Sequence, residues 1–464
     1  MNNRTLLPLL WIICFWVITG CNSVTDGSKR GQPNIIFILA DDMGYADLGV
    51  YGQLRIQTPN LDTLAAEGIR FTQHYAGSTV CAPSRGVLMT GNHTGKAYIK
   101  GNFAMQTEGN LPIPDTTVTV AELLQQAGYR TGMIGKWGLG GPGSVGGPNN
   151  QGFVYSYGYL DQRNAHEYYP PYVWENEQKV FLDNQNGQNE YTHDLFTQKA
   201  LQFINEDSEQ PFFLYLPYTI PHGKYQVPSD APYGSRSWNQ EEKNYAAMIT
   251  RMDRDVGRIL DLIKENDIDE ETILFFASDN GPVDNAISRF FDSNGTLRGY
   301  KTDLLEGGIR VPLIVRWPGT IQEGLVSDHV SAFWDFLPTA CDLAGIDIPT
   351  ETDGISYLPE LLGHEQPNHD YLYWEYFKYY FGWESGDAGP RNSFAQQAVR
   401  MGKWKGLRSN IQNNPAAPVQ LYNLEKDLGE NTDVAAQHPD IVEQIQKIFR
   451  EAHHDTEFFQ TERL

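Results

Sequence analysis

The sequence predicts an α/β fold with a central, mostly parallel sheet flanked by helices. Four short apolar runs indicate strands, and they lie at residues 33–42, 129–137, 211–222 and 271–281. Unbroken apolar runs of this length fit strands that are buried on both faces, as in a parallel sheet. Amphipathic patterns indicate helices between the strands, at residues 58–69, 116–129 and 242–266. Strands that alternate with helices are typical of an α/β domain.

Polar side chains lie at or near the end of each of the four runs. They are Asp41, Asp42, Lys136, His222, Asp279 and Asn280. In open α/β sheets ligands bind at the carboxyl ends of the strands, so we expect these side chains to converge. Four of them are oxygen donors, which suit Ca²⁺ or Mg²⁺ better than zinc. A single aspartate after a strand is often a helix cap or a turn residue, but two such doublets favour a metal site.

The N-terminus has the pattern of an export signal. Arg4 precedes a nearly unbroken apolar run, Leu6–Ile18, which is too short to span a bilayer as a mature helix. The run ends in Ile-Thr-Gly-Cys, which resembles a bacterial lipobox with Cys21 as the lipidated residue. We expect a lipoprotein signal peptide over residues 1–20 and a polar tether over 21–32. An ordinary signal peptide and an uncleaved anchor are the alternatives.

These features predict an exported lipoprotein. Its lipid, which includes palmitate, would anchor the protein to a membrane, either in the outer membrane or facing the periplasm. No later stretch is long and apolar enough to cross a bilayer. The formal charge of −23 argues against nucleic acid as a partner, and a polyanionic substrate would require a locally basic site.

Only two cysteines remain beyond the expected lipid attachment site. Cys341 lies in an apolar helical pattern, which predicts a place in the core. Cys81 has no evident structural role, although exported proteins usually use cysteine in disulfides.

Cys81 begins the stretch CAPSRGVLMTG, residues 81–91. This stretch resembles the signature of the formylglycine-dependent sulfatases, in which Cys-x-Pro-Ser-Arg is followed by Leu-x-Thr-Gly. The family converts the cysteine to Cα-formylglycine, an aldehyde that is hydrated at rest. The resemblance therefore implies that Cys81 is a modified nucleophile. It also implies a formylglycine-generating or sulfatase-maturing enzyme as a partner.

Further segments resemble the same family, and together they cover residues 33–445. They are residues 34–52, 128–140, 297–319, 335–339, 401–408 and 421–430. The resemblance implies the alkaline phosphatase-like fold, a sandwich with a mostly parallel central sheet. It also implies a catalytic domain over 33–365 and a small C-terminal subdomain with an antiparallel sheet over 366–464.

The resemblance also implies roles for individual residues. The metal ligands would be Asp41, Asp42, the modified Cys81, Asp279 and Asn280, with one Ca²⁺ per chain. Arg85 would orient the aldehyde hydrate, and the groups that bind sulfate or the leaving oxygen would be Lys136, His222 and Lys301. One hydroxyl of the hydrate would attack sulfur, and the second would then eject sulfate. His222 or Lys301 would protonate the leaving alcohol.

One position departs from the family pattern. The family's Gly-Lys-Trp-His reads Gly-Lys-Trp-Gly here, with Gly138 in place of the histidine. His166 is a candidate replacement that would bind substrate, and an ordinary loop histidine is the alternative.

The substrate is less specified by the sequence than the reaction. Aromatic residues cluster at 166–174 and 371–383. The first cluster could stack on sugars or pack internally, whereas core or sheet packing is favoured for the second. With the expected lipid anchor, this suggests a sulfated polysaccharide or its oligosaccharides. The alternatives are a phosphodiesterase or phosphonate hydrolase of the same superfamily and a non-catalytic sulfated-glycan-binding lipoprotein.

Overall fold

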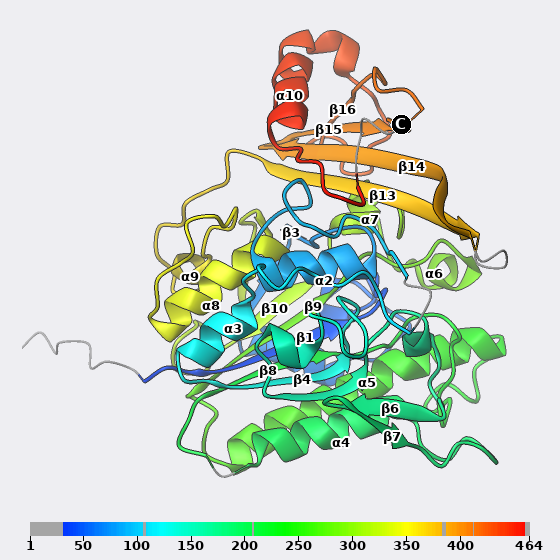
Figure 1. The fold of residues 1–464 in the computed structure, drawn as a ribbon, viewed down its shortest axis with the longest axis vertical. Coiled ribbons are helices and arrows are strands. Elements are labelled where there is room, and N and C mark those ends of the chain that lie inside the picture. The colour runs from blue at the N-terminus through cyan, green and yellow to red at the C-terminus, as the bar shows by residue number, and fades with distance from the viewer. Residues whose placement is uncertain (1–30, 105–107, 207, 383–386, 412, 460–464) are drawn as a thin grey trace, which may run out of the picture. The chain divides into compact units, whose positions relative to one another are not determined.

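A sheet of ten strands runs through the centre of the unit from Gln32 to Leu464 (Figure 1). The computed structural model describes residues 31–104, 108–206, 208–382, 387–411 and 413–459. The expected signal peptide and the lipidation site Cys21 lie outside the described residues. The strand order is β11-β2-β10-β9-β1-β8-β4-β5-β6-β7. The five central strands, β9 to β5 in this order, are mutually parallel.

The four predicted strands are neighbours at the centre of this sheet, which confirms their prediction. They are β1 (Asn34–Ala40), β4 (Arg130–Lys136), β8 (Phe212–Pro217) and β9 (Thr272–Ser278). The other six strands of this sheet are β2 (Ile69–Phe71), β5 (Tyr155–Tyr159), β6 (Tyr172–Glu175), β7 (Gln178–Phe181), β10 (Leu313–Arg316) and β11 (Leu325–Ser327). A separate pair consists of β3 (His74–Tyr75) and β12 (Ser331–Ala332). Because the central strands of the ten-stranded sheet run parallel, their carboxyl ends lie at one edge of that sheet.

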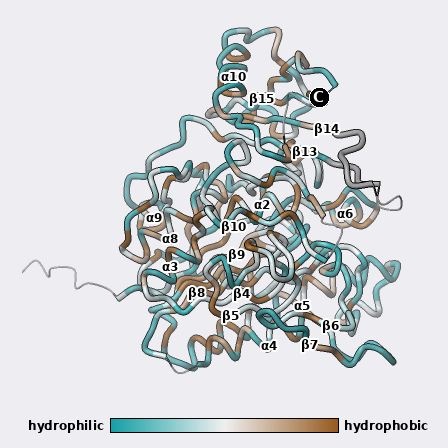
Figure 2. The backbone as a smooth tube through the Cα atoms, viewed as in Figure 1, coloured by the Kyte–Doolittle hydropathy of each residue, from teal (hydrophilic) through white to brown (hydrophobic). Residues whose placement is uncertain are grey.

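Helices cover both faces of the sheet, because both faces of its central strands are apolar (Figures 1 and 2). In β1, Phe37 packs on the side of α2 (Cys81–Thr90), α3 (Val120–Gln126) and α8 (Phe336–Ala344). Its neighbour Ile38 packs on the side of α1 (Pro59–Ala66), α4 (Thr192–Ile204) and α5 (Gln240–Glu265). The three predicted helices correspond to α1, α3 and α5. Cys341 lies buried in α8, as expected.

Shorter helices complete this part of the fold. They are α6 (Ala286–Phe291), α7 (Glu306–Ile309) and α9 (Leu358–Leu361). No helix among the described residues has the length and apolar character that a membrane crossing requires.

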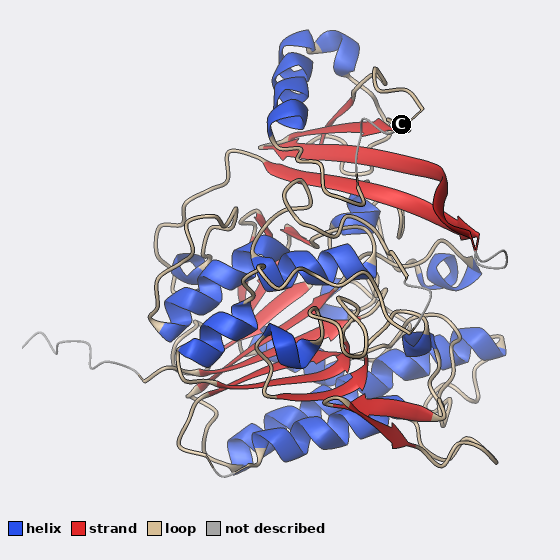
Figure 3. Ribbon diagram, in the orientation of Figure 1, coloured by secondary structure: helices blue, strands red, loops and turns tan. Residues whose placement is uncertain are grey.

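A second, antiparallel sheet of four strands follows near the C-terminus (Figure 3). It consists of β13 (Leu372–Gly382), β14 (Asp387–Met401), β15 (Trp404–Ser409) and β16 (Gln420–Asn423), and helix α10 (Pro439–Glu451) packs on it. Trp374 of β13 is buried in the main core, and its indole donates to the carbonyl of Ala76 at 2.9 Å. The predicted fold class, including this antiparallel sheet, is confirmed. The domain boundary near residue 365 remains a prediction.

Candidate active site

Three carboxylates and one thiol meet at the carboxyl edge of the central sheet. Asp41 and Asp42 follow β1, Asp279 follows β9, and Cys81 is the first residue of α2. One ligand atom from each of the four lies within 4.8 Å of all the others, and all four residues are buried. Oxygen ligands of Ca²⁺ stand about 2.3–2.6 Å from the ion, so two ligands on opposite sides are about 5 Å apart. The cluster therefore has the size of a site for one such cation.

The backbone at Asp42 explains how two adjacent carboxylates face one site. Consecutive residues of a strand point to opposite faces. Asp42 has φ +63°, a left-handed conformation that is uncommon for a residue other than glycine and interrupts this alternation. Its backbone N–H donates to Oδ1 of Asp279 at 3.1 Å, which links the ends of β1 and β9.

Asn280 supplies a further oxygen to this cluster. Its amide nitrogen donates to Oδ1 of Asp42 at 2.8 Å. Its side-chain oxygen is buried and has no hydrogen-bond partner among the described residues. A buried, unpaired acceptor is costly unless something binds it, and the same side chain contacts the carboxylate of Asp42 in the cluster. A hard divalent cation fits this donor set.

Helix α2 converts the linear motif into a spatial arrangement. Arg85 lies one turn after Cys81, on the same face of the helix. Its guanidinium donates to Oδ2 of Asp279 at 2.8 and 3.0 Å and to the carbonyl of Lys136 at 2.6 Å. The hydroxyl of Ser84 donates to the backbone carbonyl of Asp279 at 2.5 Å. Pro83 is tolerated because it lies in the first helical turn, where backbone N–H groups have no helical partner.

Two lysines also point at the carboxylates. Nζ of Lys136, the last residue of β4, donates to Oδ2 of Asp41 at 2.6 Å. Nζ of Lys301 lies 2.7 Å from Oδ1 of Asp42 and 3.4 Å from Sγ of Cys81. With Arg85, the two lysines balance the three carboxylates, so a divalent cation would make the site positive. The locally basic site that an anionic substrate requires is therefore available within an acidic protein.

Two histidines lie together at one side of the cluster. Nε2 of His222 lies 3.3 Å from Oδ2 of Asp42. The ring of His166 stacks on that of His222 with their centroids 3.8 Å apart. His166 lies in the 3₁₀ helix Asn164–His166, on the loop after β5. The structure thus brings His166 to the cluster, while its predicted role with substrate remains a prediction.

Comparison with known proteins identifies the family. A model described as Sulfatase matches residues 33–346, more than half of the chain. The chain belongs to the sulfatase family. This sulfatase is a sulfuric ester hydrolase, and the resemblance seen in its motifs is confirmed at that level. Residues 300–455 also match a model described as N-sulphoglucosamine sulphohydrolase, C-terminal.

Individual relatives span most of this sulfatase. An arylsulfatase from Hemicentrotus pulcherrimus is 35% identical over 74% of this chain and 64% of its own length. Arylsulfatase A from Homo sapiens is 33% identical over 90% of this chain and 87% of its own. An N-acetylgalactosamine-6-O-sulfatase from Bacteroides thetaiotaomicron is 28% identical over 96% and 98%. The crystal structure of Ps i-CgsB in complex with k-i-k-neocarrahexaose matches with a TM-score of 0.78 and 28% identity, over 93% and 96% of the two chains.

Burial and charge set the protonation of the sulfatase site. Burial and the nearby Asp41 raise the pKa of Asp279, because the carboxylates crowd one another. Burial also disfavours ionised Asp41, but Lys136, His222 and Arg85 outweigh it and lower the pKa of that carboxyl. Burial raises the pKa of the Cys81 thiol to about 12, so an unmodified cysteine here is a thiol and a poor nucleophile. The crowded charge and the inert thiol both suit a site that a cation and a modified residue 81 complete.

The sequence did not point to Gln162, which lies near Gly138. Gly138 has φ +83°, and a Cβ built on it would stand 2.0 Å from Nε2 of Gln162. The departure from the family pattern at position 138 implies either that another group takes the place of the histidine or that its step proceeds differently. Which group does so depends on the path of the loop after β5, and the sequence does not specify that path.

The aromatic segment 166–174 is mostly engaged in packing. Tyr168 is buried, and its hydroxyl donates to the carbonyls of Thr219 and His222. The side chains of Tyr172 and Trp174 both donate to the carboxylate of Glu108. The second aromatic segment forms strand β13, as expected.

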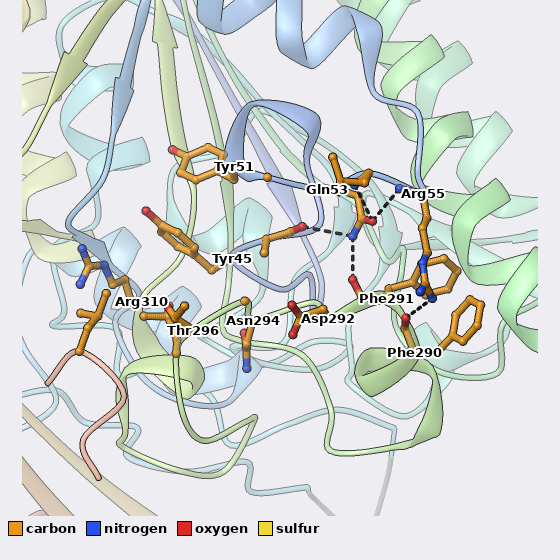
Figure 4. Close-up of a pocket in the computed structure, with 16 residues that line it drawn as sticks. Tyr45, Tyr51, Gln53, Arg55, Phe290, Phe291, Asp292, Asn294, Thr296 and Arg310 are labelled. Atoms are coloured by element: carbon orange, nitrogen blue, oxygen red, sulfur yellow. Dashed lines mark hydrogen bonds between the residues drawn. The ribbon is translucent and has the colours of Figure 1, made fainter. Parts of the chain in front are cut away.

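A separate pocket of about 450 Å³ lies between the loops around Tyr51 and Phe290 (Figure 4). Its arginines are already paired. Nη1 of Arg55 donates to the carbonyl of Phe290 at 2.6 Å, and Nη1 of Arg310 lies 3.1 Å from Oε2 of Glu306. We therefore assign it no part in the reaction.

Proposed function

We propose that this sulfatase removes sulfate from a sulfated carbohydrate, a polysaccharide or its oligosaccharides, with Cys81 converted to formylglycine. The observation that carries the proposal is the position of Cys81. Its sulfur lies 3.5 Å from Oδ1 of Asp41 and 3.4 Å from the ammonium of Lys301. A nucleophile at this point would stand between a cation-binding carboxylate and a positive charge.

The residues around Cys81 fit two groups that the protein would acquire. Ca²⁺ would be held by Asp41, Asp42, Asp279, Asn280 and the modified residue 81. The cation supplies positive charge that stabilises a sulfuryl group as charge develops. The hydrated aldehyde supplies one hydroxyl for attack on sulfur and a second whose deprotonation releases sulfate.

The side chains of this sulfatase bind the anion and supply a proton. Lys136 and Lys301 would donate hydrogen bonds to sulfate oxygens once the cation neutralises their carboxylate partners. Arg85 holds Asp279 through two hydrogen bonds and so keeps that ligand in place. His222 or Lys301 would protonate the alcohol as it leaves, and Lys301 lies nearer to residue 81.

Carbohydrate as the substrate class is supported by two relatives. One carries the name N-acetylgalactosamine-6-O-sulfatase, and the other is described in complex with a neocarrahexaose. Both align with nearly the whole of this chain. The sugar, the position of its sulfate ester and exo or endo action are left open by this proposal.

We also propose that the protein is exported and anchored to a membrane through a lipid on Cys21, and that a formylglycine-generating or sulfatase-maturing enzyme acts on it. The lipobox-like Ile-Thr-Gly-Cys sequence supports the anchor. Expression with a labelled fatty acid tests this. Incorporation that disappears in Cys21→Ala supports the lipid, whereas no incorporation in the wild type refutes it.

A screen of defined sulfated oligosaccharides, read by the mass lost as sulfate, tests the substrate. We expect desulfation by the matured protein and none by Cys81→Ala. Phosphate diesters and phosphonate esters assayed in parallel test the alternative hydrolase chemistry. Faster turnover of those esters than of every sulfate ester would contradict the proposal.

A further inference from the structure

The side chain of Gln162 is buried without satisfying its own hydrogen bonds. The residue is 8% exposed, and neither its amide nitrogen nor its amide oxygen has a partner among the described residues. Burying an unpaired amide costs free energy, so such groups usually have a partner. This unfavourable burial occurs at the active-site edge of the sheet. A bound molecule could supply the missing hydrogen-bond partner there.

The amide lies beside the strand end that carries a sulfate-binding lysine of the proposed site. Nε2 of Gln162 occupies the space where a Cβ at position 138 would stand, 2.0 Å from that point. Gly138 follows Lys136 by two residues, and Nζ of Lys136 donates to Asp41. The carbonyl of Lys136 also accepts from Arg85 at 2.6 Å. The glycine at 138 is therefore required for this glutamine to reach its position.

Backbone hydrogen bonds hold both residues of this contact, whereas the side-chain amide of Gln162 has no partner among the described residues. Gly138 N–H donates to the carbonyl of Leu160 at 3.1 Å, which extends the pairing of β4 and β5. The backbone N–H of Gln162 donates to Oδ1 of Asn110 at 2.8 Å. Four residues later, His166 stacks on His222 beside Asp42. The loop after β5 thus delivers both side chains to the same edge.

We propose that Gln162 contacts the sulfate group of the bound ester, with its Nε2 donating a hydrogen bond to a sulfate oxygen. Sulfate oxygens only accept hydrogen bonds, and the amide nitrogen offers two donors. An amide does not titrate, so this contact keeps its donor at every pH, unlike an imidazole at the same place. The proposal rests on sulfate ester hydrolysis and not on which sugar carries the ester.

Gln162→Met tests the contact, because methionine has a similar shape and offers no donor. Gln151→Met is a matched control. Gln151 is also buried with an unpartnered amide oxygen, and its amide nitrogen donates to the carbonyl of Val145 at 3.0 Å. It precedes β5 whereas Gln162 follows it, so the two glutamines lie at opposite ends of one strand.

Inorganic sulfate is the probe. Its affinity is measured by calorimetry on Ca²⁺-loaded protein that also carries Cys81→Ala, a substitution that removes turnover. Hydrolysis of para-nitrophenyl sulfate and thermal unfolding are measured in the otherwise wild-type protein. We expect Gln162→Met to weaken sulfate binding and to lower kcat/KM, each by about 10- to 100-fold, the effect of losing one hydrogen bond to a charged group. Its unfolding temperature should not fall, because the lost amide had no partner. Gln151→Met should lower the unfolding temperature and leave sulfate affinity unchanged.

Unchanged sulfate affinity in Gln162→Met would overturn the proposal. So would a fall in its unfolding temperature equal to that of Gln151→Met, because the role would then be structural. Weaker sulfate binding in Gln162→Met, in a protein that desulfates no carbohydrate, would support the Gln162 contact and refute the proposed substrate class.

Discussion

At the scale of single residues, the site consists of buried acidic and basic side chains whose charges compensate one another. Asp279 contacts several of the residues that form this site. Its carboxylate accepts from Arg85 and from the backbone of Asp42, and its carbonyl accepts from Ser84. Removing one partner of a buried ion pair leaves the other charge without compensation. Asp279 therefore stabilises the fold in addition to its proposed role as a cation ligand.

We predict that Asp279→Ala abolishes sulfate release and lowers the free energy of unfolding by about 3–5 kcal/mol, because the buried guanidinium of Arg85 loses its main partner. A desulfation assay and urea denaturation measure these two effects, and calcium titration measures the loss of calcium affinity that we expect when this ligand is removed. Asp255→Ala is the control, since Asp255 is a buried carboxylate that pairs with His193 away from the cluster. It should destabilise the protein and leave calcium affinity intact. Full desulfation by Asp279→Ala would contradict the assignment of this ligand.

The sequence predicted these residues unequally. The doublets Asp41–Asp42 and Asp279–Asn280 follow long apolar runs, so their convergence could be deduced from the pattern of strands. The left-handed backbone at Asp42 could not, because nothing local distinguishes it from an aspartate in an extended turn. Gln162 was missed because its place depends on a contact with Gly138 across two neighbouring strands.

At the scale of elements, helix α2 fixes the geometry of the motif. It begins at Cys81, the proposed nucleophile, and ends at Thr90, and the Gly91 that follows has the left-handed φ of +70° that closes a helix. A Cβ on Gly91 would stand 2.5 Å from Oγ1 of Thr352 and 3.1 Å from Cβ of Leu337. The last glycine of the motif is therefore required by both its backbone and its neighbours.

Gly91→Ala should destabilise the protein by more than the about 1–2 kcal/mol that a left-handed alanine costs. Gly345→Ala separates the two causes. Gly345 ends α8 with a φ of +66°, and a Cβ there would meet nothing within 4 Å. Chemical denaturation should show a larger loss for Gly91→Ala than for Gly345→Ala. Equal losses of stability would mean that the contact with Thr352 does not add to the cost of the Gly91→Ala substitution.

Four central strands, β1, β4, β8 and β9, were predictable because each is long and apolar, whereas the other strands of the sheet were not. Strands β10 and β11 have only four and three residues, too few for a period to be read from sequence. The antiparallel C-terminal sheet came from the family resemblance and not from the residue pattern.

At the scale of the whole molecule, a buried ion pair joins the second sheet to the main part of the fold. Glu375 of β13 pairs with Lys100, and its other oxygen lies 2.7 Å from Nδ1 of His453. Burial would raise the pKa of Glu375, but Lys100 and His453 outweigh it and lower that pKa to about 2, from an ordinary value of 4.5. The folded protein therefore favours the charged form of Glu375. The ionised carboxylate of Glu375 therefore contributes stability above pH 4.5, and this contribution is lost as the pH falls through about 2.

We predict that Glu375→Gln is less stable than the wild type at neutral pH and that this difference shrinks as the pH falls from 4.5 to 2. Thermal unfolding of both proteins across that range measures it. A difference that stays constant with pH would show that Glu375 stabilises the fold through packing and not through its charge.

The chemical state of residue 81 in active, natively matured protein is the decisive test of a formylglycine nucleophile. Peptide mass spectrometry of the fragment that contains this residue distinguishes a formylglycine aldehyde from a thiol. We predict the aldehyde in material that releases sulfate, in an amount proportional to the activity. Fully active protein in which residue 81 is an ordinary cysteine would contradict it.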